Sequence, residues 1–511
     1  MADGAEMMFR TALAAGVDVC FANPGTTEMA MVAALDRVPG IRPVLGLFEG
    51  VCSGACHGYA RVADRPALGL YHLGPGYVNA LANLHNARRS FTPVVNLVGD
   101  QASWHLPYDA PLSSDTTKLA TWVGWHRHVN SASRLASDTA AAIHAATDGA
   151  GGPATLVIPA DTTWDDAPPE IPEVGFGSRR TVPADRVMEA AAALRSGDSA
   201  LIVGGPLVTA EMAADMARIA AATGCRPLRY RAATNELGLG RHFIPDIPYF
   251  PEAAARATAG VRTAVLLTEG EPVTFFGYPD IPSTTLPADC RRLQLAGVAD
   301  DIARCLSDLA DAVGAGPATP PPAPDPLPAA TGPLDIMSLG RVLAAEMPEN
   351  AVLVQDGITS AAGFLTMTDR AAPFRMIQAM GGAIGAGLPT ALGAAIAAPD
   401  RRVMCLQSDG SAMYTIQALW SMAREGVDVT VIMANNHRYN ILQMELHRAG
   451  IDQPGPNALA LTELSNPDLD FCSLARGMGV PASRATTAEE LTEAVARANA
   501  TPGPTLVEAI L

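Results

Sequence analysis

The sequence has little that would suit a secreted, membrane-bound or nucleic-acid-binding protein. Its 511 residues include only eight cysteines, without CxxC pairs or zinc-type spacing, so reduced thiols are expected. The N-terminus lacks a basic segment followed by an apolar one, and no apolar run approaches the roughly 20 residues of a membrane span. The net charge of −17 argues against nucleic acid and anionic membrane as partners. We therefore expect a cytoplasmic protein.

Two proline-containing segments divide the chain. Residues 166–183 contain four prolines, and residues 314–333 are a run of proline, alanine and glycine that cannot hold a helix or a sheet. With these segments as linkers, the expected domains cover residues 1–165, 184–313 and 334–511. Three domains also agree with the chain length, at roughly 100–200 residues per domain.

Short apolar runs mark the expected strands, and amphipathic stretches mark the helices between them. The expected strands cover residues 17–22, 45–47, 68–72, 94–98, 200–203, 403–406 and 427–433. The clearest helices are expected over residues 415–424 and from near Ala210 onward. This alternation predicts an α/β fold of three consecutive doubly wound parallel-sheet domains, with helices on both faces of each sheet.

Residues 402–436 form the most informative segment, because they predict a strand–helix–strand unit. Asp409 follows the first strand and Asn436 follows the second. A right-handed crossover brings the carboxyl ends of parallel strands to one edge of a sheet, so the two side chains can converge. Two oxygen ligands, beside backbone N–H groups of Gly410 and Ser411 at a helix start, suit a magnesium-bound diphosphate. The alternative at Asp409 is a plain turn with a helix cap, but its pairing with Asn436 favours a cofactor site.

A carboxylate and a glycine run mark two further candidate positions. Glu49 ends an apolar strand and opens a helix of small residues. It either suits the helix dipole or lies buried, where it could share a proton with a ligand nitrogen. The glycine run at residues 381–387 is a weak nicotinamide signal. It serves either close helix packing or the approach of backbone carbonyls to a ligand, with Ile384 as its only bulky side chain.

Two of the ten histidines are candidates for acid–base chemistry. His72 ends an expected strand before a glycine turn, where it could transfer a proton. His105 lies in an expected loop and could reach a pocket. The other eight are expected to be structural or on the surface. No HxxxH pair or Ser-His-Asp order suggests a zinc site or a hydrolase.

With these motifs, the chain resembles the thiamine diphosphate (ThDP)-dependent enzymes of the 2-oxo acid decarboxylase and acetolactate synthase group. The resemblance extends over essentially the whole chain. The matches at residues 23–28, around Glu49, at 68–72 and at 411–420 look most like benzoylformate decarboxylase. The resemblance implies pyrimidine-binding, central and diphosphate-binding domains, in that order. It also implies a homodimer or homotetramer with active sites shared between subunits.

The resemblance implies ThDP and Mg²⁺ as cofactors, and FAD is not expected because nothing in the central domain signals flavin. Asp409, Asn436 and a backbone carbonyl near Arg438 would bind Mg²⁺. Ser408 stands where the family usually has glycine, and a serine is small enough to leave cofactor binding intact. The further implied cofactor contacts are Gly25, Thr359, Ser360, Gly410, Ser411 and Tyr439.

The implied roles at the pyrimidine end belong to three residues. Glu49 would protonate the pyrimidine ring, the Gly382 carbonyl would accept a hydrogen bond from the ring's amine, and Ile384 would hold the cofactor bent. The resulting imino form of the ring would then generate the ylid. The protein supplies geometry and electrostatics, and the cofactor supplies the electron sink.

At the substrate end, His72 would transfer a proton and Thr26 would orient the substrate carboxylate. The second catalytic histidine of benzoylformate decarboxylase would fall near Gly277 and is absent, so His105 is the candidate replacement. The tryptophan that acetolactate synthases have shortly after Asn436 is also missing.

The implied reaction is a ThDP- and Mg²⁺-dependent non-oxidative decarboxylation of a 2-oxo acid through an ylid and an enamine. The alternative is an acetolactate synthase-type carboligase, which joins the enamine to a second 2-oxo acid or an aldehyde. An alternative of another class is a non-catalytic ThDP-fold regulatory paralogue, and the retained Glu49, Asp409 and Asn436 argue against it. A flavin- or nicotinamide-dependent oxidoreductase is the least favoured reading.

Overall fold

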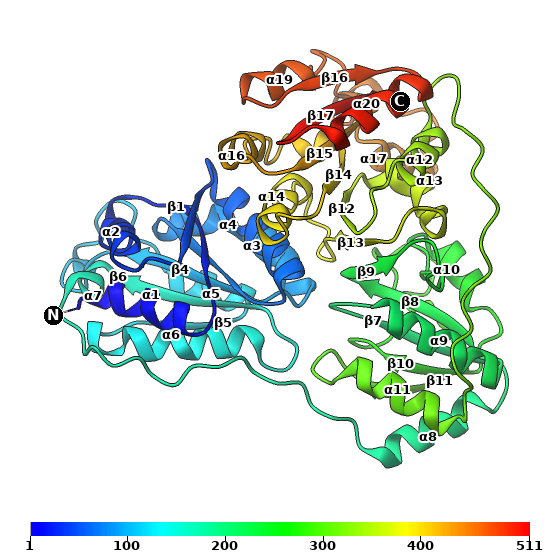
Figure 1. Cartoon of the computed structure of the whole chain (residues 1–511), viewed down its shortest axis with the longest axis horizontal. Helices are drawn as coiled ribbons and strands as arrows, with labels where there is room; N and C mark the ends of the chain where they lie inside the picture. The colour runs from blue at the N-terminus through cyan, green and yellow to red at the C-terminus, as the bar shows by residue number, and fades with distance from the viewer. Residues whose placement is uncertain (1) are drawn as a thin grey trace. The chain divides into compact units, whose positions relative to one another are not determined.

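The computed structural model describes residues 2–511, which form two compact units (Figure 1). Of the described residues, unit 1 comprises 2–147, 152–176 and 326–511, and unit 2 comprises 148–151 and 177–325. Unit 1 therefore combines both ends of the sequence. The linker segments 166–183 and 314–333 contain neither helix nor strand. The division into three domains remains a prediction.

The N-terminal part of unit 1 is built on a six-stranded parallel sheet in the order β2-β1-β3-β4-β6-β5. Its central strands β4 and β6 are buried along their whole length, as expected for a parallel sheet covered on both faces. The strands are β1 (Val19–Asn23), β2 (Arg42–Leu45), β3 (Ala67–Tyr71), β4 (Val94–Asp100), β5 (Trp125–His128) and β6 (Pro153–Pro159). The helices, with η for 3₁₀, are α1 (Gly4–Ala14), η1 (Thr26–Glu28), α2 (Met29–Arg37), α3 (Glu49–Ala63), α4 (Leu73–Arg89), η2 (Leu106–Tyr108), α5 (Thr116–Val123), α6 (Ala132–Thr147) and α7 (Ala160–Trp164).

Unit 2 contains a four-stranded parallel sheet in the order β11-β10-β7-β8. The strands of this sheet are β7 (Ser199–Gly205), β8 (Arg226–Ala232), β10 (Thr263–Leu267) and β11 (Arg291–Ala296). Unit 2 also contains strand β9 (Thr234–Leu237), which lies outside this sheet. Its helices are α8 (Ala184–Leu194), α9 (Ala210–Thr223), α10 (Pro251–Thr258) and α11 (Ile302–Ala312). The helix expected from Ala210 is thus present.

The C-terminal part of unit 1 has parallel strands in the order β16-β17-β15-β14-β12-β13. They are β12 (Ala351–Asp356), β13 (Phe374–Gln378), β14 (Val403–Ser408), β15 (Val429–Asn435), β16 (Ala482–Ala485) and β17 (Thr505–Ile510). The helices are α12 (Ile336–Ala345), η3 (Ile358–Ala361), α13 (Ala362–Leu365), η4 (Thr368–Arg370), α14 (Gly387–Ala397), α15 (Asp409–Ala412), α16 (Ala418–Glu425), α17 (Asn440–Arg448), α18 (Pro456–Ala460), α19 (Phe471–Gly477) and α20 (Ala488–Ala500). The predicted α/β class with three parallel sheets is confirmed.

Most expected strands lie within a few residues of observed ones, but the strand expected at residues 45–47 is wrong. The observed strand β2 spans Arg42–Leu45, because residues 46–48 turn the chain into α3. Pro43 is tolerated in β2 because this strand lies at the edge of the sheet and pairs only with β1. The strand expected at 427–433 begins two residues later and continues to Asn435.

Helices α3 and α14 pack closely in unit 1 and connect its N-terminal and C-terminal parts (Figure 1). Glycines on both helices make this approach possible. A Cβ added to Gly393 would lie 1.8 Å from the Ala55 carbonyl oxygen, and one on Gly58 would lie 1.9 Å from that of Thr390. Backbone therefore meets backbone at this contact, with no room for a side chain.

The eight cysteines are all buried and free. Burial raises the pKa of the Cys20 thiol to about 12, which suits a packing role rather than a nucleophilic one. None of the described helices is both long and apolar enough to span a bilayer.

Candidate active site

Asp409 and Asn436 lie together at the carboxyl ends of two neighbouring strands. Strands β14 and β15 pair in parallel up to Ser408 and Ala434, so the residues that follow emerge at the same edge. The backbone N–H of Asn436 donates to Asp409 Oδ2 at 3.2 Å. The crossover topology therefore brings the two residues together, as the strand–helix–strand pattern predicts.

The Asp409 carboxylate lies in a setting that suits a cation. Its Oδ1 accepts the Gly410 N–H at 2.8 Å, and burial raises the pKa of the Asp409 carboxyl. Among residues 2–511 no cationic side chain forms an ion pair with it. The Asn436 Oδ1 is close by and accepts the Arg438 N–H at 3.1 Å. A buried carboxylate beside an amide oxygen is the kind of donor set that Mg²⁺ binds, so the residues fit that ion.

A second cluster of carboxylates lies elsewhere in the chain and is already paired with an arginine. The side chains of Asp470, Cys472 and Glu508 form the only cluster of at least three His, Cys, Asp or Glu ligand atoms within 4.8 Å that the described residues contain. Arg484 already pairs with both of its carboxylates, at 3.1 and 2.9 Å. Arg484 therefore already supplies a positive charge to both carboxylates.

Ser411 is anchored by a buried carboxylate that the sequence did not single out. Its hydroxyl donates to Asp356 Oδ2 at 2.6 Å and accepts the Gly385 N–H at 2.8 Å. Asp356 Oδ2 also accepts the Gln407 amide and the Gly387 N–H, both at 3.0 Å, while burial raises the pKa of its carboxyl. Since the hydroxyl proton of Ser411 is engaged, this residue can offer its backbone N–H to a diphosphate, as can Gly410. Asp356 ends β12 just as Asp409 follows β14, and that strand-end position was its sequence signal.

In the glycine segment at residues 381–385, every second carbonyl group accepts a hydrogen bond from a side chain. The carbonyls of residues 381, 383 and 385 accept hydrogen bonds from His85, Asn86 and Thr415, at 3.1, 2.7 and 2.8 Å respectively. In the described chain the Gly382 carbonyl has no such partner, and Gly382 is exposed with a φ of +78°. Ile384, two residues on, is half-buried. The segment thus leaves the exposed Gly382 carbonyl free two residues before a bulky side chain, which fits an aminopyrimidine.

One face of helix α4 joins this glycine segment to Glu49. Asn79 donates to Glu49 Oε2 at 3.0 Å. Asn83, one turn further along, donates to the carbonyls of Gly50 and Gly385 at 2.9 and 3.3 Å. Glu49 itself is the first residue of α3 and is 9% exposed. Sequence reasoning missed Asn79 and Asn83, because only the fold shows that their helix faces two separate segments.

His72 contacts a second buried carboxylate, that of Glu28. His72 Nδ1 lies 2.8 Å from Glu28 Oε2, and Glu28 has no exposed surface. The histidine is the residue before α4, and Glu28 ends η1, which begins at Thr26. Thr26 is exposed at this helix start, so it is free to meet a ligand. Glu28 also escaped the sequence prediction, although it lies inside the matched segment 23–28.

The remaining predicted residues differ in how near the structure brings them. Tyr439 covers Gly410: a Cβ added to that glycine would lie 2.2 Å from Tyr439 Cε1. The Thr359 hydroxyl accepts the Asn440 amide at 3.4 Å, which places η3 beside the start of α17. The Ser360 hydroxyl is buried without a partner in the described chain. The His105 ring contacts those of Trp104 and Tyr108, at 5.6 and 5.8 Å between ring centres, and no described contact joins it to His72.

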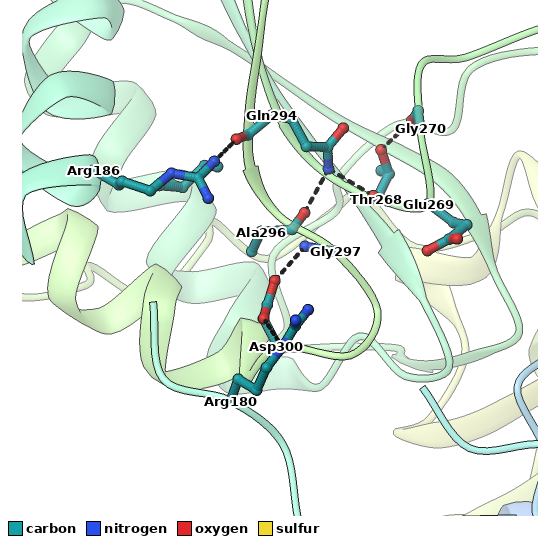
Figure 2. A pocket seen from close by; sticks show the side chains of 10 residues that line it. Arg180, Arg186, Thr268, Glu269, Gly270, Gln294, Ala296, Gly297 and Asp300 are labelled. Carbon is teal, nitrogen blue, oxygen red and sulfur yellow. Dashed lines mark hydrogen bonds and ion pairs between the residues drawn. The ribbon is translucent and has the colours of Figure 1, made fainter. Parts of the chain in front are cut away.

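Unit 2 contains a separate cavity of about 370 Å³ at the carboxyl ends of β10 and β11 (Figure 2). Its polar groups bind one another: Arg180 pairs with Asp300 at 3.0 Å, and the Gln294 amide donates to the carbonyls of Thr268 and Ala296. The Arg186 guanidinium donates to the Gln294 carbonyl in the same cavity. None of the predicted site residues lines it.

Comparison with protein families matches both ends of the chain. A model described as "Thiamine pyrophosphate enzyme, N-terminal TPP binding domain" matches residues 2–119, and the corresponding "C-terminal TPP binding domain" model matches residues 359–509. Together the two matches cover more than half of the sequence. They include Glu49 and His72 at one end and Asp409 and Asn436 at the other.

Individual relatives match over the whole length. The chain is 45% identical to Mycobacterium tuberculosis IlvX, provisionally named as an acetolactate synthase large subunit, covering 100% of this chain and 99% of that protein. It is 29% identical to the benzoylformate decarboxylase of Pseudomonas aeruginosa, covering 96% of each. Among solved structures, the 4-hydroxybenzoylformate decarboxylase of Rhodococcus jostii RHA1 superimposes with a TM-score of 0.86 at 26% identity, covering 100% of this chain and 99% of that one.

Proposed function

Because the chain belongs to the thiamine pyrophosphate enzyme family, as a ThDP-dependent enzyme of the acetolactate synthase and benzoylformate decarboxylase group, we propose that it decarboxylates a 2-oxo acid without oxidation, with Mg²⁺ as the second cofactor. The observation that carries the proposal is the glycine segment at 381–385, which leaves the Gly382 carbonyl free beside Ile384. That arrangement suits the recognition of an aminopyrimidine.

The cofactor would be held at both ends by groups already described. Backbone N–H groups of Gly410 and Ser411 would bind the diphosphate, with Asp409, Asn436 and the backbone near Arg438 around Mg²⁺. Gly25, Thr359, Ser360 and Tyr439 are proposed as further contacts. When bound, ThDP supplies the nucleophilic carbon and the electron sink for the loss of CO₂.

At the pyrimidine end, Glu49 would exchange a proton with a ring nitrogen, and the Gly382 carbonyl would accept an N–H from the ring's amino group. Asn79 holds the Glu49 carboxylate by one oxygen, which leaves the other oxygen for the ring. Fixing a carboxylate before the reaction avoids the cost of orienting it in each turnover.

At the substrate end, His72 would move a proton at Nε2, because its Nδ1 is held by Glu28. Thr26 would orient the substrate carboxylate from the exposed start of η1. His105 stays a candidate for a second proton-transferring group.

The carboligase reading remains the second candidate. It is supported by the 45% identity to a protein provisionally named as an acetolactate synthase large subunit. A carboligase and a decarboxylase share the loss of CO₂ and differ in whether a proton or a second carbonyl compound is then taken up. A regulatory paralogue without activity is disfavoured by the presence of Glu49, Asp409 and Asn436.

We further propose a homodimer or homotetramer with shared active sites, and a cytoplasmic location. The first rests on the family resemblance. The second is supported by eight free, buried cysteines, since reduced thiols are usual in the cytoplasm.

A panel of 2-oxo acids tests the reaction. The purified protein with ThDP and Mg²⁺ is given benzoylformate, 4-hydroxybenzoylformate, pyruvate and 2-oxobutyrate, and CO₂ and organic products are measured separately. We expect CO₂ from at least one acid and a loss of about 100-fold or more in Glu49→Gln. As a control, the same substitution at the exposed Glu170, Glu170→Gln, should leave the rate unchanged. Aldehyde products support the decarboxylase, acyloin products support the carboligase, and no CO₂ from any acid would contradict both.

A further inference from the structure

We propose that Glu28 is a positioning residue that fixes the proton on Nδ1 of His72, so that Nε2 is the nitrogen that exchanges a proton with the substrate. This inference rests on the proposed function for the role of His72. The Glu28–His72 pair is defined by one short contact, Glu28 Oε2 to His72 Nδ1 at 2.8 Å.

The Glu28 carboxylate is fully engaged and fully buried. Its Oε2 accepts the Gly25 N–H at 2.8 Å in addition to facing His72, and its Oε1 accepts the Thr27 hydroxyl at 2.6 Å. None of its surface is exposed, whereas 23% of the His72 side chain is exposed. A buried carboxylate that accepts three donors has its orientation set before any ligand arrives.

Two glycines make room for the Glu28–His72 pair. A Cβ added to Gly99, near the end of β4, would lie 1.8 Å from Glu28 Oε1. A Cβ added to Gly25 would lie 2.1 Å from His72 Nδ1. Any side chain at either position would displace one partner. The backbone therefore carries no side chain at the two positions that contact this pair.

Glu49 is another titratable group that lies near His72. Both residues approach the same point on α4, where a Cβ on Gly76 would lie 2.7 Å from Glu49 Oε1 and 3.3 Å from His72 Cβ. On the side of β4, Asp100 follows Gly99 and lies 3.8 Å from His128 Nε2. His72 thus lies between the carboxylate that holds its Nδ1 and the one proposed to act on the cofactor.

The pairing has a direct consequence for proton transfer. A carboxylate can only accept, so the Nδ1 proton of His72 stays on the side of Glu28. Nε2 is then the only ring nitrogen that gains or loses a proton during turnover. When Nε2 gives its proton to the reacting carbon, the imidazole left behind keeps the Nδ1 proton, and solvent restores the proton on Nε2. This is the orienting role that a carboxylate plays toward a catalytic histidine in other enzymes.

The decisive experiment is a double-mutant cycle read by activity and by nitrogen NMR. Glu28→Gln, His72→Ala and the double variant are assayed with benzoylformate and with pyruvate, in the presence of ThDP and Mg²⁺. We expect Glu28→Gln to lower kcat by about 10- to 100-fold with little change in KM. In the His72→Ala background the same change should cost nothing further, since Glu28 acts through the imidazole. An equal loss in both backgrounds would overturn the proposal.

Nitrogen spectra of protein labelled with ¹⁵N-histidine give a readout independent of activity. The His72 resonances are identified by their loss in His72→Ala. In the wild-type protein, Nδ1 should stay protonated at every pH at which the protein is folded, with only Nε2 titrating; titration of Nδ1 would overturn the proposal even if Glu28→Gln fails to fold. Asp138→Asn, at a carboxylate that is 1% exposed and paired with Arg127, controls for the cost of neutralising a buried acid. A wild-type protein inactive on both acids would refute the proposed function for these substrates, while the spectra would still test the Glu28–His72 pair.

Discussion

The side-chain amide of Asn83 donates to the carbonyl of Gly385, 302 residues further along the chain, at 3.3 Å. The same amide donates to the carbonyl of Gly50, next to Glu49, at 2.9 Å. One buried asparagine therefore ties the start of α3 to the glycine segment that precedes α14. This connection fixes the placement of the two segments relative to each other within one subunit.

Replacing Asn83 with alanine should loosen both segments at once. The carbonyl of Gly50 would keep only the Ser53 hydroxyl at 3.3 Å, and the Asn86 amide would keep only the carbonyl of residue 383. Each hydrogen bond lost with Asn83 should cost roughly 0.5–1.5 kcal/mol. We expect a lower free energy of unfolding and weaker ThDP binding, measured by thermal denaturation and by titration calorimetry. Asn457→Ala, at an exposed position, should change neither. Unaltered ThDP affinity in a destabilised Asn83→Ala would separate the two effects and contradict the positioning role.

Gly393→Ala should be strongly destabilising. Its new methyl group would lie 1.8 Å from the Ala55 carbonyl oxygen, so α3 and α14 would have to separate. Overpacking of this kind typically costs about 1–3 kcal/mol, and a clash with backbone belongs at the upper end. Gly477→Ala is the matched control, because nothing lies within 4 Å of the added Cβ and the position is helical. There alanine should be neutral or slightly stabilising, by about 0.5–1 kcal/mol. Equal melting temperatures for the two variants would contradict the packing argument.

His57 should make the protein less stable in mild acid. It is buried, both ring nitrogens lack hydrogen-bond partners in the described chain, and burial together with nearby Arg61 lowers its pKa from 6.5 to about 3. Below about pH 6.5, His57 therefore binds a proton in the unfolded chain, whereas in the folded chain it binds one only near pH 3. Stability is lost as the pH falls through that window, by about 1.4 kcal/mol per unit.

His57→Leu removes this proton linkage. The difference in the free energy of unfolding between wild type and variant should change by about 1.4 kcal/mol from pH 6 to pH 5, in favour of the variant, and stay constant between pH 8 and pH 7. Denaturant titrations at these four pH values measure it. A difference that is constant throughout would mean that His57 becomes protonated in the folded protein.

Removal of the metal should release the cofactor. With EDTA in excess, we expect the affinity for ThDP to fall, because the diphosphate would lose the cation that joins it to Asp409. Asp409→Asn should weaken Mg²⁺-dependent ThDP binding by at least about 10-fold. Asp470→Asn, in the cluster that pairs with Arg484, should leave ThDP and Mg²⁺ affinity unchanged. A strong effect of Asp470→Asn would instead point to that cluster as the metal site.

Much of the architecture could be predicted from the sequence, because alternating apolar and amphipathic segments determine an α/β fold. The meeting of Asp409 and Asn436 could also be predicted, since both follow neighbouring parallel strands and topology alone places those ends together. The strand expected at 45–47 failed because its apolar residues belong to the turn into α3, while β2 at the sheet edge tolerates Pro43.

The hydrogen-bonded partners of the site were beyond reach from the sequence. Asn79 and Asn83 look like ordinary polar positions on a helix until the fold shows which segments that helix faces. Glu28 looks like a first-turn carboxylate, and only the nearby backbone of Gly99 shows that it points inward. These residues act through contacts between segments far apart in sequence. Such contacts leave no local pattern in a single sequence.

Because all eight thiols are buried, their labelling rates measure local opening of the structure. A thiol reagent can reach a cysteine only when the surrounding structure opens, so labelling rates report local unfolding rather than surface chemistry. Cys52 and Cys56 lie on α3, the helix that begins at Glu49, whereas Cys225 and Cys305 lie in unit 2. Mass spectrometry of pulse-labelled protein would thus measure local opening of α3 separately from that of unit 2. Slower labelling of Cys52 on adding ThDP would show that the bound cofactor stabilises α3 against opening.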